Sequence, residues 1–212
     1  GGFRGLATTA QVHTPLRVHA ARKGFQARAD AAKPMTPPEV AKLYHFPPKL
    51  DGSGQCIAII ELGGGFRAED LTAYFKSLGI KEPAVTAVSV SGAHNEPDGP
   101  TKDANGEVML DIEVAGAVAP GAKIAVYFAP NTDEGFLGAL NAAIHDNARN
   151  PSVISISWGA AEATWTDQAK RDFDSACADG AAMGVTFTVS AGDHGAPDTD
   201  DPAETRANVD FP

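Results

Sequence analysis

Cysteine, long apolar runs and aromatic side chains are all scarce in this chain of 212 residues. Its two cysteines exclude a fold built on several disulfides. No run of about eighteen apolar residues occurs, which argues against a membrane-spanning helix. Basic residues are in the minority, and a net charge of −10 is the opposite of what nucleic-acid-binding domains usually carry. The composition therefore predicts a globular protein with neither nucleic acid nor membrane among its partners.

The charge is distributed unevenly along the chain. Residues 1–35 hold six of the 17 Lys and Arg residues and one of the 27 acidic residues, so they carry +5 and the remainder −15. This basic arm is poor in large aliphatic residues and has no apolar period, which is typical of a linker, a processed segment or an unpacked tail. It also lacks the apolar stretch of a signal peptide. We expect residues 36–212 to form the folded body.

Within the body, strand-like and helix-like segments alternate. Thr36, Pro37 and Glu39 form a helix start, with a capping residue, a proline at the first helical position and a capping box. Further segments predict strands at 55–62, 85–90, 123–128, 153–157 and 185–190, and helices at 68–78, 107–119, 133–148 and 166–182. This alternation predicts an α/β fold, with a parallel sheet and helices on both faces. The chain stops at 209–212 without a closing helix, so we expect the domain to be incomplete.

One segment, residues 106–118, is apolar on nearly all sides except for its acids. Glu107 and Asp111 lie about 40° apart on one helix face, which they share with Val114 and Val118. We expect this helix to be central and buried, and a buried pair of carboxylates costs several kcal/mol unless it shares protons or hydrogen bonds. That cost indicates a functional pair. The pattern also fits an acid at a helix N-terminus beside a structural aspartate.

Polar side chains follow three of the predicted strands. Glu61 ends the first strand, Ser157, Trp158 and Gly159 follow the fourth, and Asp193 follows the last. Because the carboxyl ends of parallel strands share one sheet edge, these residues predict a site there. Taken singly, each has a plainer reading: a solvent-facing acid, a core aromatic residue and an aspartate turn.

Several common motifs are missing. Gly63–Gly65 matches neither the dinucleotide fingerprint nor the phosphate-binding loop, and the six histidines lack zinc-ligand spacing. None of the nine serines lies in Gly-x-Ser-x-Gly. We interpret Cys56 and Cys177 as packing thiols.

Taken together, these segments resemble the sedolisin family of serine-carboxyl peptidases, in particular its kumamolisin-like branch. The matching stretches follow the family's order and are residues 55–65, 106–116, 119–124, 155–159, 191–193 and 209–212. The resemblance implies a subtilisin-like fold and cleavage of proteins or peptides at acid pH by a Ser–Glu–Asp triad. It also implies secretion into an acidic environment.

The same resemblance implies roles for individual residues. Glu107 becomes the general base, Asp111 the acid that orients it, and Asp193 the acid of the oxyanion hole. The remaining residues become an outer network (Glu61, Trp158) and a substrate-binding edge (Ser157, Trp158, Gly159). A glutamate base also fits the chemistry, because the best base has a pKa near the working pH.

This chain departs from the family pattern at the nucleophile. The family serine lies in a Gly-Thr-Ser motif nearer the C-terminus, and no Gly-Thr-Ser occurs here. The family's calcium site (Ca2+) lies in that later region as well, so no metal site is expected in this chain. The resemblance thus implies the N-terminal part of a peptidase domain, with the C-terminal part of the same precursor as its partner, expected as a second chain. It also makes residues 1–35 a linker from a prodomain.

Three other functions remain open from the residues alone. A non-catalytic relative would bind peptide along residues 157–159 without cleaving it. A glycosidase would use Glu107 and Asp111 as an acid–base pair, although such pairs flank a sugar from opposite sides. A nucleotide-binding protein would need the fingerprint that is missing.

Overall fold

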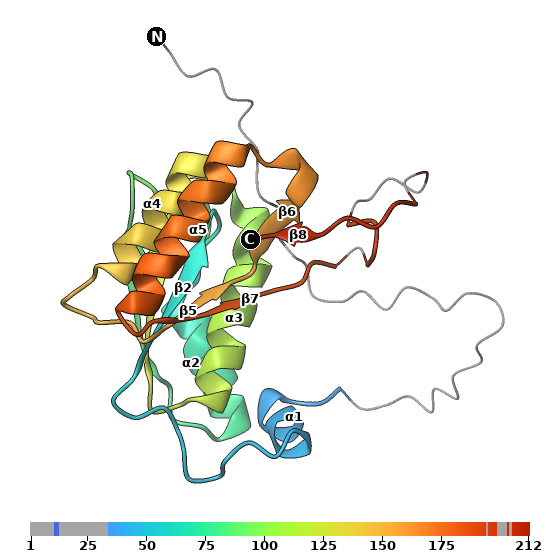
Figure 1. Ribbon diagram of the computed structural model, residues 1–212. Coiled ribbons are helices and arrows are strands. Elements are labelled where there is room, and N and C mark those ends of the chain that lie inside the picture. The colour runs from blue at the N-terminus through green and yellow to red at the C-terminus, as the bar shows by residue number, and fades with distance from the viewer. Residues whose placement is uncertain (1–10, 13–33, 194, 199–202, 204) are drawn as a thin grey trace, which may run out of the picture.

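A sheet of five parallel strands forms the centre of the molecule (Figure 1). The computed structural model describes residues 11–12, 34–193, 195–198, 203 and 205–212. The rest of the basic arm, residues 1–10 and 13–33, lies outside the described residues, so its linker role stays a prediction. The strand order is β3-β4-β2-β5-β7. The strands are β2 (Cys56–Glu61), β3 (Ala84–Ser89), β4 (Lys123–Phe128), β5 (Val153–Ile156) and β7 (Thr186–Val189).

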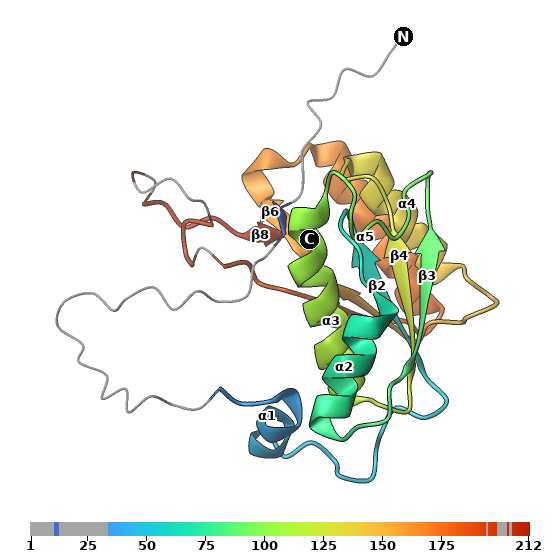
Figure 2. The same cartoon turned by 180° about the vertical axis from the view of Figure 1, so that it is seen from behind.

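Helices cover both faces of this sheet, as the sequence predicts (Figures 1 and 2). One face carries α2 (Ala68–Leu78) and α3 (Asn105–Val118), and the other carries α4 (Asp133–Ile144) and α5 (Asp167–Ala182). A short helix α1 (Pro37–Leu43) contacts α3. Two 3-10 turns, η1 (Lys102–Ala104) and η2 (Glu162–Thr164), precede α3 and α5. In the described part of the chain, no helix has the length and apolar character to cross a membrane.

Strand β2 separates two cores because successive side chains point to opposite faces of the sheet. Ala58 and Ile60 pack toward α4 and α5, whereas Ile57 and Ile59 pack toward α2 and α3. The continuous apolar run of this strand is buried on both sides, as predicted. By the same alternation, Glu61 continues the row of Ile57 and Ile59, on the face that carries α3.

The connection through α3 has an unusual hand. Along the sheet the chain steps in one direction from β2 to β3, and in the opposite direction in its other three crossovers. Yet α3 lies on the same face as α2, while α4 and α5 lie on the other face. The β3–α3–β4 crossover therefore has the opposite hand to the other three, against the strong preference for one hand. This places α3 on the face of the sheet toward which the Glu61 side chain points.

Helix boundaries follow local chemistry. At α1, the main-chain N–H and the hydroxyl of Thr36 both donate to Glu39 Oε2, at 2.7 and 2.9 Å, which confirms the predicted start. Helix α2 ends at Gly79, which adopts φ +66° as C-terminal glycines commonly do. Helix α4 ends at Ile144, four residues before the predicted end. There Asp146 accepts hydrogen bonds from the main-chain N–H groups of residues 148 and 149, and this turn competes with the helix.

A second, three-stranded sheet was not predicted. Its middle strand is β6 (Trp158–Ala161), flanked antiparallel by β1 (Gln11–Val12) and β8 (Asp210–Phe211). Strand β6 follows β5 after the single residue Ser157. The sequence predicts one strand that ends at residue 157, and it does not predict β6. Two elements far apart in the sequence therefore meet on the stretch that was predicted to bind substrate.

Candidate active site

Glu61 is a fully buried carboxyl group at the carboxyl end of β2. Its Oε2 accepts a hydrogen bond from Trp158 Nε1 at 3.0 Å. Burial raises the pKa of Glu61 well above its usual value, the charge of Asp111 raises the pKa further, and the Trp158 hydrogen bond lowers it. The structure thus brings together the two residues predicted to form an outer network.

Glu107 and Asp111 lie one turn apart near the start of α3, as predicted. Glu107 is buried, and a side-chain hydrogen bond joins it to Asp111. Burial raises the pKa of Asp111 to about 6, although hydrogen bonds from Ser157 and Glu107 act to lower it. The charge of Glu107 also raises the pKa of Glu61, so three carboxyl groups share one buried region. Such groups titrate as a coupled set, and the set holds protons at pH values where isolated carboxyl groups are ionised.

Helix α3 is less enclosed than the sequence predicts. Val108 and Ile112 are fully buried against β2 and β4, but Val114, which was expected on the buried face with the acids, is 41% exposed. The helix therefore has one face packed on the sheet and one face open in this chain.

Ser157 connects the acid pair to the edge that is predicted to bind substrate. Its Oγ donates a hydrogen bond to Asp111 Oδ1 at 2.9 Å. The sequence pattern predicts only substrate binding for Ser157 and does not reveal this contact. Strand alternation was the available signal, because Ile154 and Ile156 pack toward α4 and α5, so Ser155 and Ser157 must point toward α3.

Asp193 lies at the carboxyl edge of the large sheet, after β7. It follows β7 in the loop 190–193, and its Oδ2 is buried with no hydrogen-bond partner among the described residues. Gly192 beside it adopts φ +76° and lies close to Asp198 and Asp210. The predicted oxyanion acid is therefore at the expected sheet edge.

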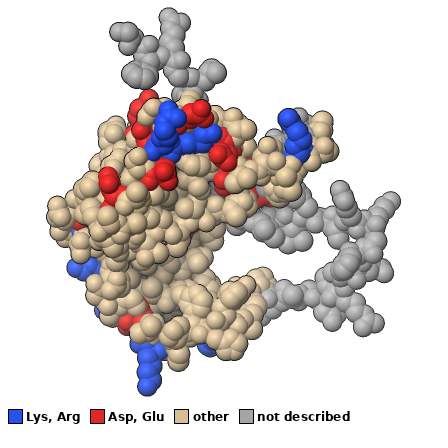
Figure 3. All heavy atoms as spheres, viewed as in Figure 1, with Lys and Arg blue, Asp and Glu red and all other residues tan. Residues whose placement is uncertain are grey.

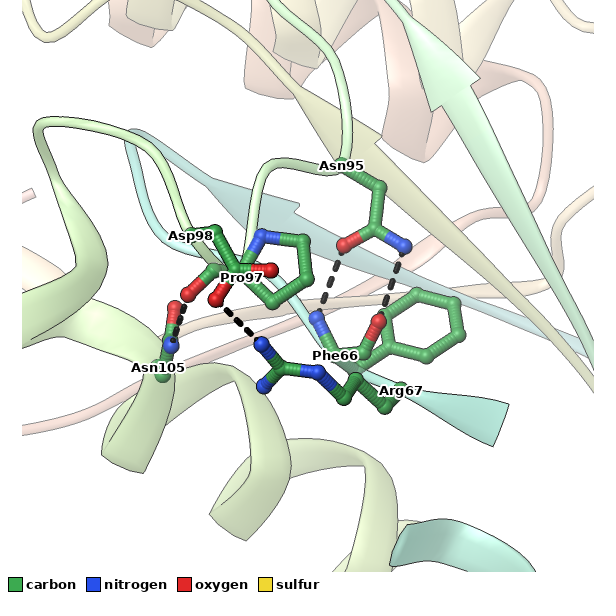
Figure 4. A network of polar contacts seen from close by, with 6 residues as sticks. All are labelled: Phe66, Arg67, Asn95, Pro97, Asp98 and Asn105. Atoms are coloured by element: carbon green, nitrogen blue, oxygen red, sulfur yellow. Dashed lines mark hydrogen bonds and ion pairs between the residues drawn. The ribbon is translucent and has the colours of Figure 1, made fainter. Parts of the chain in front are cut away.

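The glycine-rich loop after β2 has a structural role that the sequence analysis left unassigned. Asn95 accepts a hydrogen bond from the main-chain N–H of Phe66 at 2.7 Å and donates one to its carbonyl at 3.0 Å (Figure 4). Gly64 donates its main-chain N–H to Thr101 Oγ1 at 2.8 Å. Asn105, the first residue of α3, donates to the carbonyl of Pro97 at 2.7 Å (Figure 4). These bonds fix the start of α3, and with it Glu107, relative to the end of β2.

The predicted substrate-binding edge is paired with another segment of the same chain. In β1, Gln11 lies opposite Gly159 and Val12 lies opposite Trp158, in antiparallel register. An extended segment of the basic arm thus adds a strand to β6, which is how extended peptides commonly bind a sheet edge.

No metal centre forms among the residues that the structure describes, since nowhere do three His, Cys, Asp or Glu side chains gather as a ligand set. Cys56 and Cys177 are unpaired thiols, the first of them buried, in keeping with packing roles.

The fold is that of an α/β domain, with a five-stranded parallel sheet and helices on both faces. The Subtilase family matches residues 87–210, more than half of the chain. The chain therefore belongs to the subtilase family.

Individual relatives confirm the resemblance to serine-carboxyl peptidases. Kumamolisin of Bacillus sp. (strain MN-32) is 51% identical over 211 residues, which is 98% of this chain and 38% of that protein. Tripeptidyl-peptidase sed5 of Aspergillus fumigatus is 30% identical over 85% of this chain and 33% of that protein. Sedolisin of Pseudomonas sp. (strain 101) is 27% identical over 92% of this chain and 34% of that protein.

The fold is confirmed by a solved structure. Pseudomonas sedolisin, a serine-carboxyl proteinase complexed with two molecules of pseudo-iodotyrostatin, matches with a TM-score of 0.72 and 25% identity, over 85% of this chain and 51% of that chain. The chain spans only about a third of the curated relatives' length and is thus part of a kumamolisin- and sedolisin-like catalytic domain.

Proposed function

We propose that the protein to which this chain belongs is an acid-acting endopeptidase that hydrolyses proteins through a Ser–Glu–Asp triad. Glu107 is the general base, Asp111 orients it, Asp193 is the oxyanion-hole acid, and Glu61 with Trp158 supports the pair. The observation that carries this proposal is the buried, hydrogen-bonded pair of Glu107 and Asp111. Their position beside a strand edge that already holds an extended segment supports it.

The proton chemistry fits an acidic working range. With a pKa of about 6, Asp111 keeps its proton at pH 3–5. If Asp111 donates a hydrogen bond to Glu107 and keeps its own proton, Glu107 can be the carboxylate that accepts a proton from the attacking serine hydroxyl. A protonated Asp193 would in turn donate a hydrogen bond to the oxyanion, which a carboxylate cannot do.

The pairing of β1 with β6 supports a peptide substrate and a precursor form. Peptide substrates would add to β6 through main-chain hydrogen bonds, as Gln11 and Val12 do. Residues 1–35 would then be a linker that occupies this edge until it is cut. We accordingly propose a zymogen that is secreted and activated in an acidic environment.

The nucleophilic serine is proposed to lie outside these 212 residues, in the C-terminal part of the same precursor, either continuous with this chain or as a second chain. Two surfaces support such a partner: the outer edge of β7, where Val189 is 41% exposed, and the open face of α3 at Val114. In the view of Figure 3, charged side chains gather mainly at the top, over η2 and the start of α5. The middle of the molecule in this view shows few charged side chains. The family's calcium ion is proposed to bind in the same C-terminal part of the precursor.

The test is Glu107→Gln in the full-length protein, with peptide hydrolysis followed from pH 3 to 8. We expect wild-type activity at pH 3–5 and no detectable activity in the variant, because an amide cannot accept the serine proton. Glu113→Gln, on another face of the same helix, is the matched control and should retain activity. Near-normal hydrolysis by the Glu107 variant would remove this residue from the mechanism.

The same experiment separates catalysis from peptide binding alone. A wild-type protein that binds peptides along β6 but never cleaves them would identify a non-catalytic member. Peptide hydrolysis should be measured in parallel for a variant that lacks residues 1–33 and therefore has an unblocked β6 edge. This variant ensures that an uncut linker is not mistaken for a lack of catalytic activity.

A further inference from the structure

We propose that Ser157 is a positioning residue that holds the Asp111 carboxyl group through its side-chain hydroxyl and thereby couples the peptide-binding strand to the proton balance of the acid pair. This inference rests on the proposed function, and it gives the Ser157 side chain a role separate from its main-chain contact with peptide.

Backbone geometry places the hydroxyl group. Ser157 is the single residue between β5, a central strand of the large sheet, and β6, the middle strand of the small sheet. Its neighbour Ile156 is buried toward α4 and α5, and Ile156 lies opposite Ile60 in the register with β2. Alternation then directs Ser157 toward α3, beside the end of β2. A displacement of β6 must therefore move this hydroxyl group relative to α3.

The hydrogen bond is specific for one oxygen of Asp111. Oγ of Ser157 donates to Oδ1 at 2.9 Å, while Oδ2 is buried and has no hydrogen-bond partner within 3.5 Å among the described residues. A hydroxyl group that holds Oδ1 fixes the plane of the carboxyl group. Without this bond, the carboxyl group could rotate and exchange its two oxygens.

The charged groups around Asp111 make this donor important. Glu107 lies on the same helix as Asp111, and Glu61 lies at the end of β2, where the charge of Asp111 raises the pKa of Glu61. Among the residues that the structure describes, no Lys, Arg or His contributes to the pKa of Asp111. Hydrogen bonds from Ser157 and Glu107 are the two interactions that favour its ionised form, and Ser157 makes the larger contribution. Loss of the hydroxyl group should therefore raise the pKa of Asp111 and shift the loss of activity at high pH further upward.

The experiment compares Ser157→Ala, Ser157→Thr and the matched control Ser155→Ala in the full-length protein. Ser155 lies on the same strand face, two residues earlier. The first readout is the pH dependence of kcat and of KM for a peptide. The second is NMR titration of ¹³Cγ-labelled aspartate, with the Asp111 signal identified by its loss in Asp111→Asn.

We expect Ser157→Ala to move the basic limb of the kcat profile and the Asp111 titration upward by about one pH unit, with KM little changed. Ser157→Thr keeps the hydroxyl group and should restore both, and Ser155→Ala should match the wild type. If Ser157→Ala does not fold, Ser157→Cys, which has similar size and a weaker donor, provides the same comparison.

Unchanged titration and unchanged pH profile in Ser157→Ala would overturn the proposal. Failure of the proposed function looks different: the wild type would not hydrolyse peptides at all. The NMR readout then decides alone, because an upward shift of the Asp111 titration supports the positioning role and an unmoved titration overturns it.

Discussion

The indole N–H of Trp158 donates a hydrogen bond to the fully buried carboxyl group of Glu61, at 3.0 Å between Nε1 and Oε2. The two residues are 97 positions apart in the sequence and lie at the ends of neighbouring segments of the sheet. Because Glu61 also feels the charges of Asp111 and Glu107, this bond connects the start of β6 to the carboxyl cluster.

Replacing Trp158 tests this connection. Trp158→Phe removes the donor and should destabilise the fold by about 1–3 kcal/mol, since a buried polar atom loses its partner. It should also raise the pKa of Glu61 further, because the hydrogen bond lowers it. The control is Trp165→Phe, which removes a second buried indole, one that donates to the carbonyl of Ala160 at 3.3 Å. NMR titration of Glu61 should respond to the first variant only; equal titration curves would contradict the link.

Asp111 should make stability depend on pH in the opposite sense to a salt-bridged aspartate. Its pKa rises from 3.8 to about 6 on folding, because burial disfavours the charged form. The native state therefore binds the proton more tightly than the unfolded state. The resulting stability, about 3 kcal/mol, is fully present below pH 3.8 and is lost as the pH rises through about 6.

Urea unfolding at pH 4 and pH 7.5 measures this effect. Asp111→Asn should flatten the difference between the two pH values, whereas Asp167→Asn, at an exposed position in α5, should leave it as in the wild type. An Asp111→Asn variant with the full wild-type pH dependence would place the source of that dependence elsewhere.

Asp193 is proposed to act on the oxyanion. Asp193→Ala should lower kcat by roughly 10²–10³, the usual loss for one oxyanion donor. Asp193→Asn keeps an N–H donor and should recover part of this activity. Asp174→Ala, at an exposed position in α5, is the control. Activity of the alanine variant within a few-fold of the wild type would exclude the role.

The loop after β2 should be intolerant of any side chain at Gly64. This residue adopts φ +72°, and a Cβ atom there would lie 2.8 Å from the carbonyl carbon of Ala104 and 2.9 Å from the nitrogen of Asn105. Gly79 has a similar φ of +66° with open space around it. We expect Gly79→Ala to cost about 1 kcal/mol and Gly64→Ala roughly 2–5 kcal/mol, because a clash at the start of α3 adds to the strain.

Activity distinguishes the two glycine variants further. Gly64→Ala should lower kcat beyond the loss of folded protein, because it displaces Glu107, while Gly79→Ala should not. Equal stability and equal kcat in the two variants would show that contact with the start of α3 is unimportant.

Local patterns were enough to predict most of the fold. The buried run of β2, the capping box at Thr36 and Glu39, and Gly79 at the end of α2 each act within a few residues, so the sequence contains their whole cause. Helical spacing likewise predicted that Glu107 and Asp111 share a face. The end of α4 was wrong because Asp146 forms its turn with groups that periodicity does not reveal.

Only the tertiary structure decided which groups meet. The reversed hand of the β3–α3–β4 crossover puts α3 on the face of the sheet toward which Glu61 and Ser157 point. No local preference encodes that hand. The strand β6 and its pairing with Gln11–Val12 and Asp210–Phe211 depend on contacts more than 45 residues apart in sequence. The sequence by itself determined which residues carry chemistry. Long-range packing, which brings together segments that are distant along the chain, determined that a serine, a tryptophan and three acids form one buried cluster.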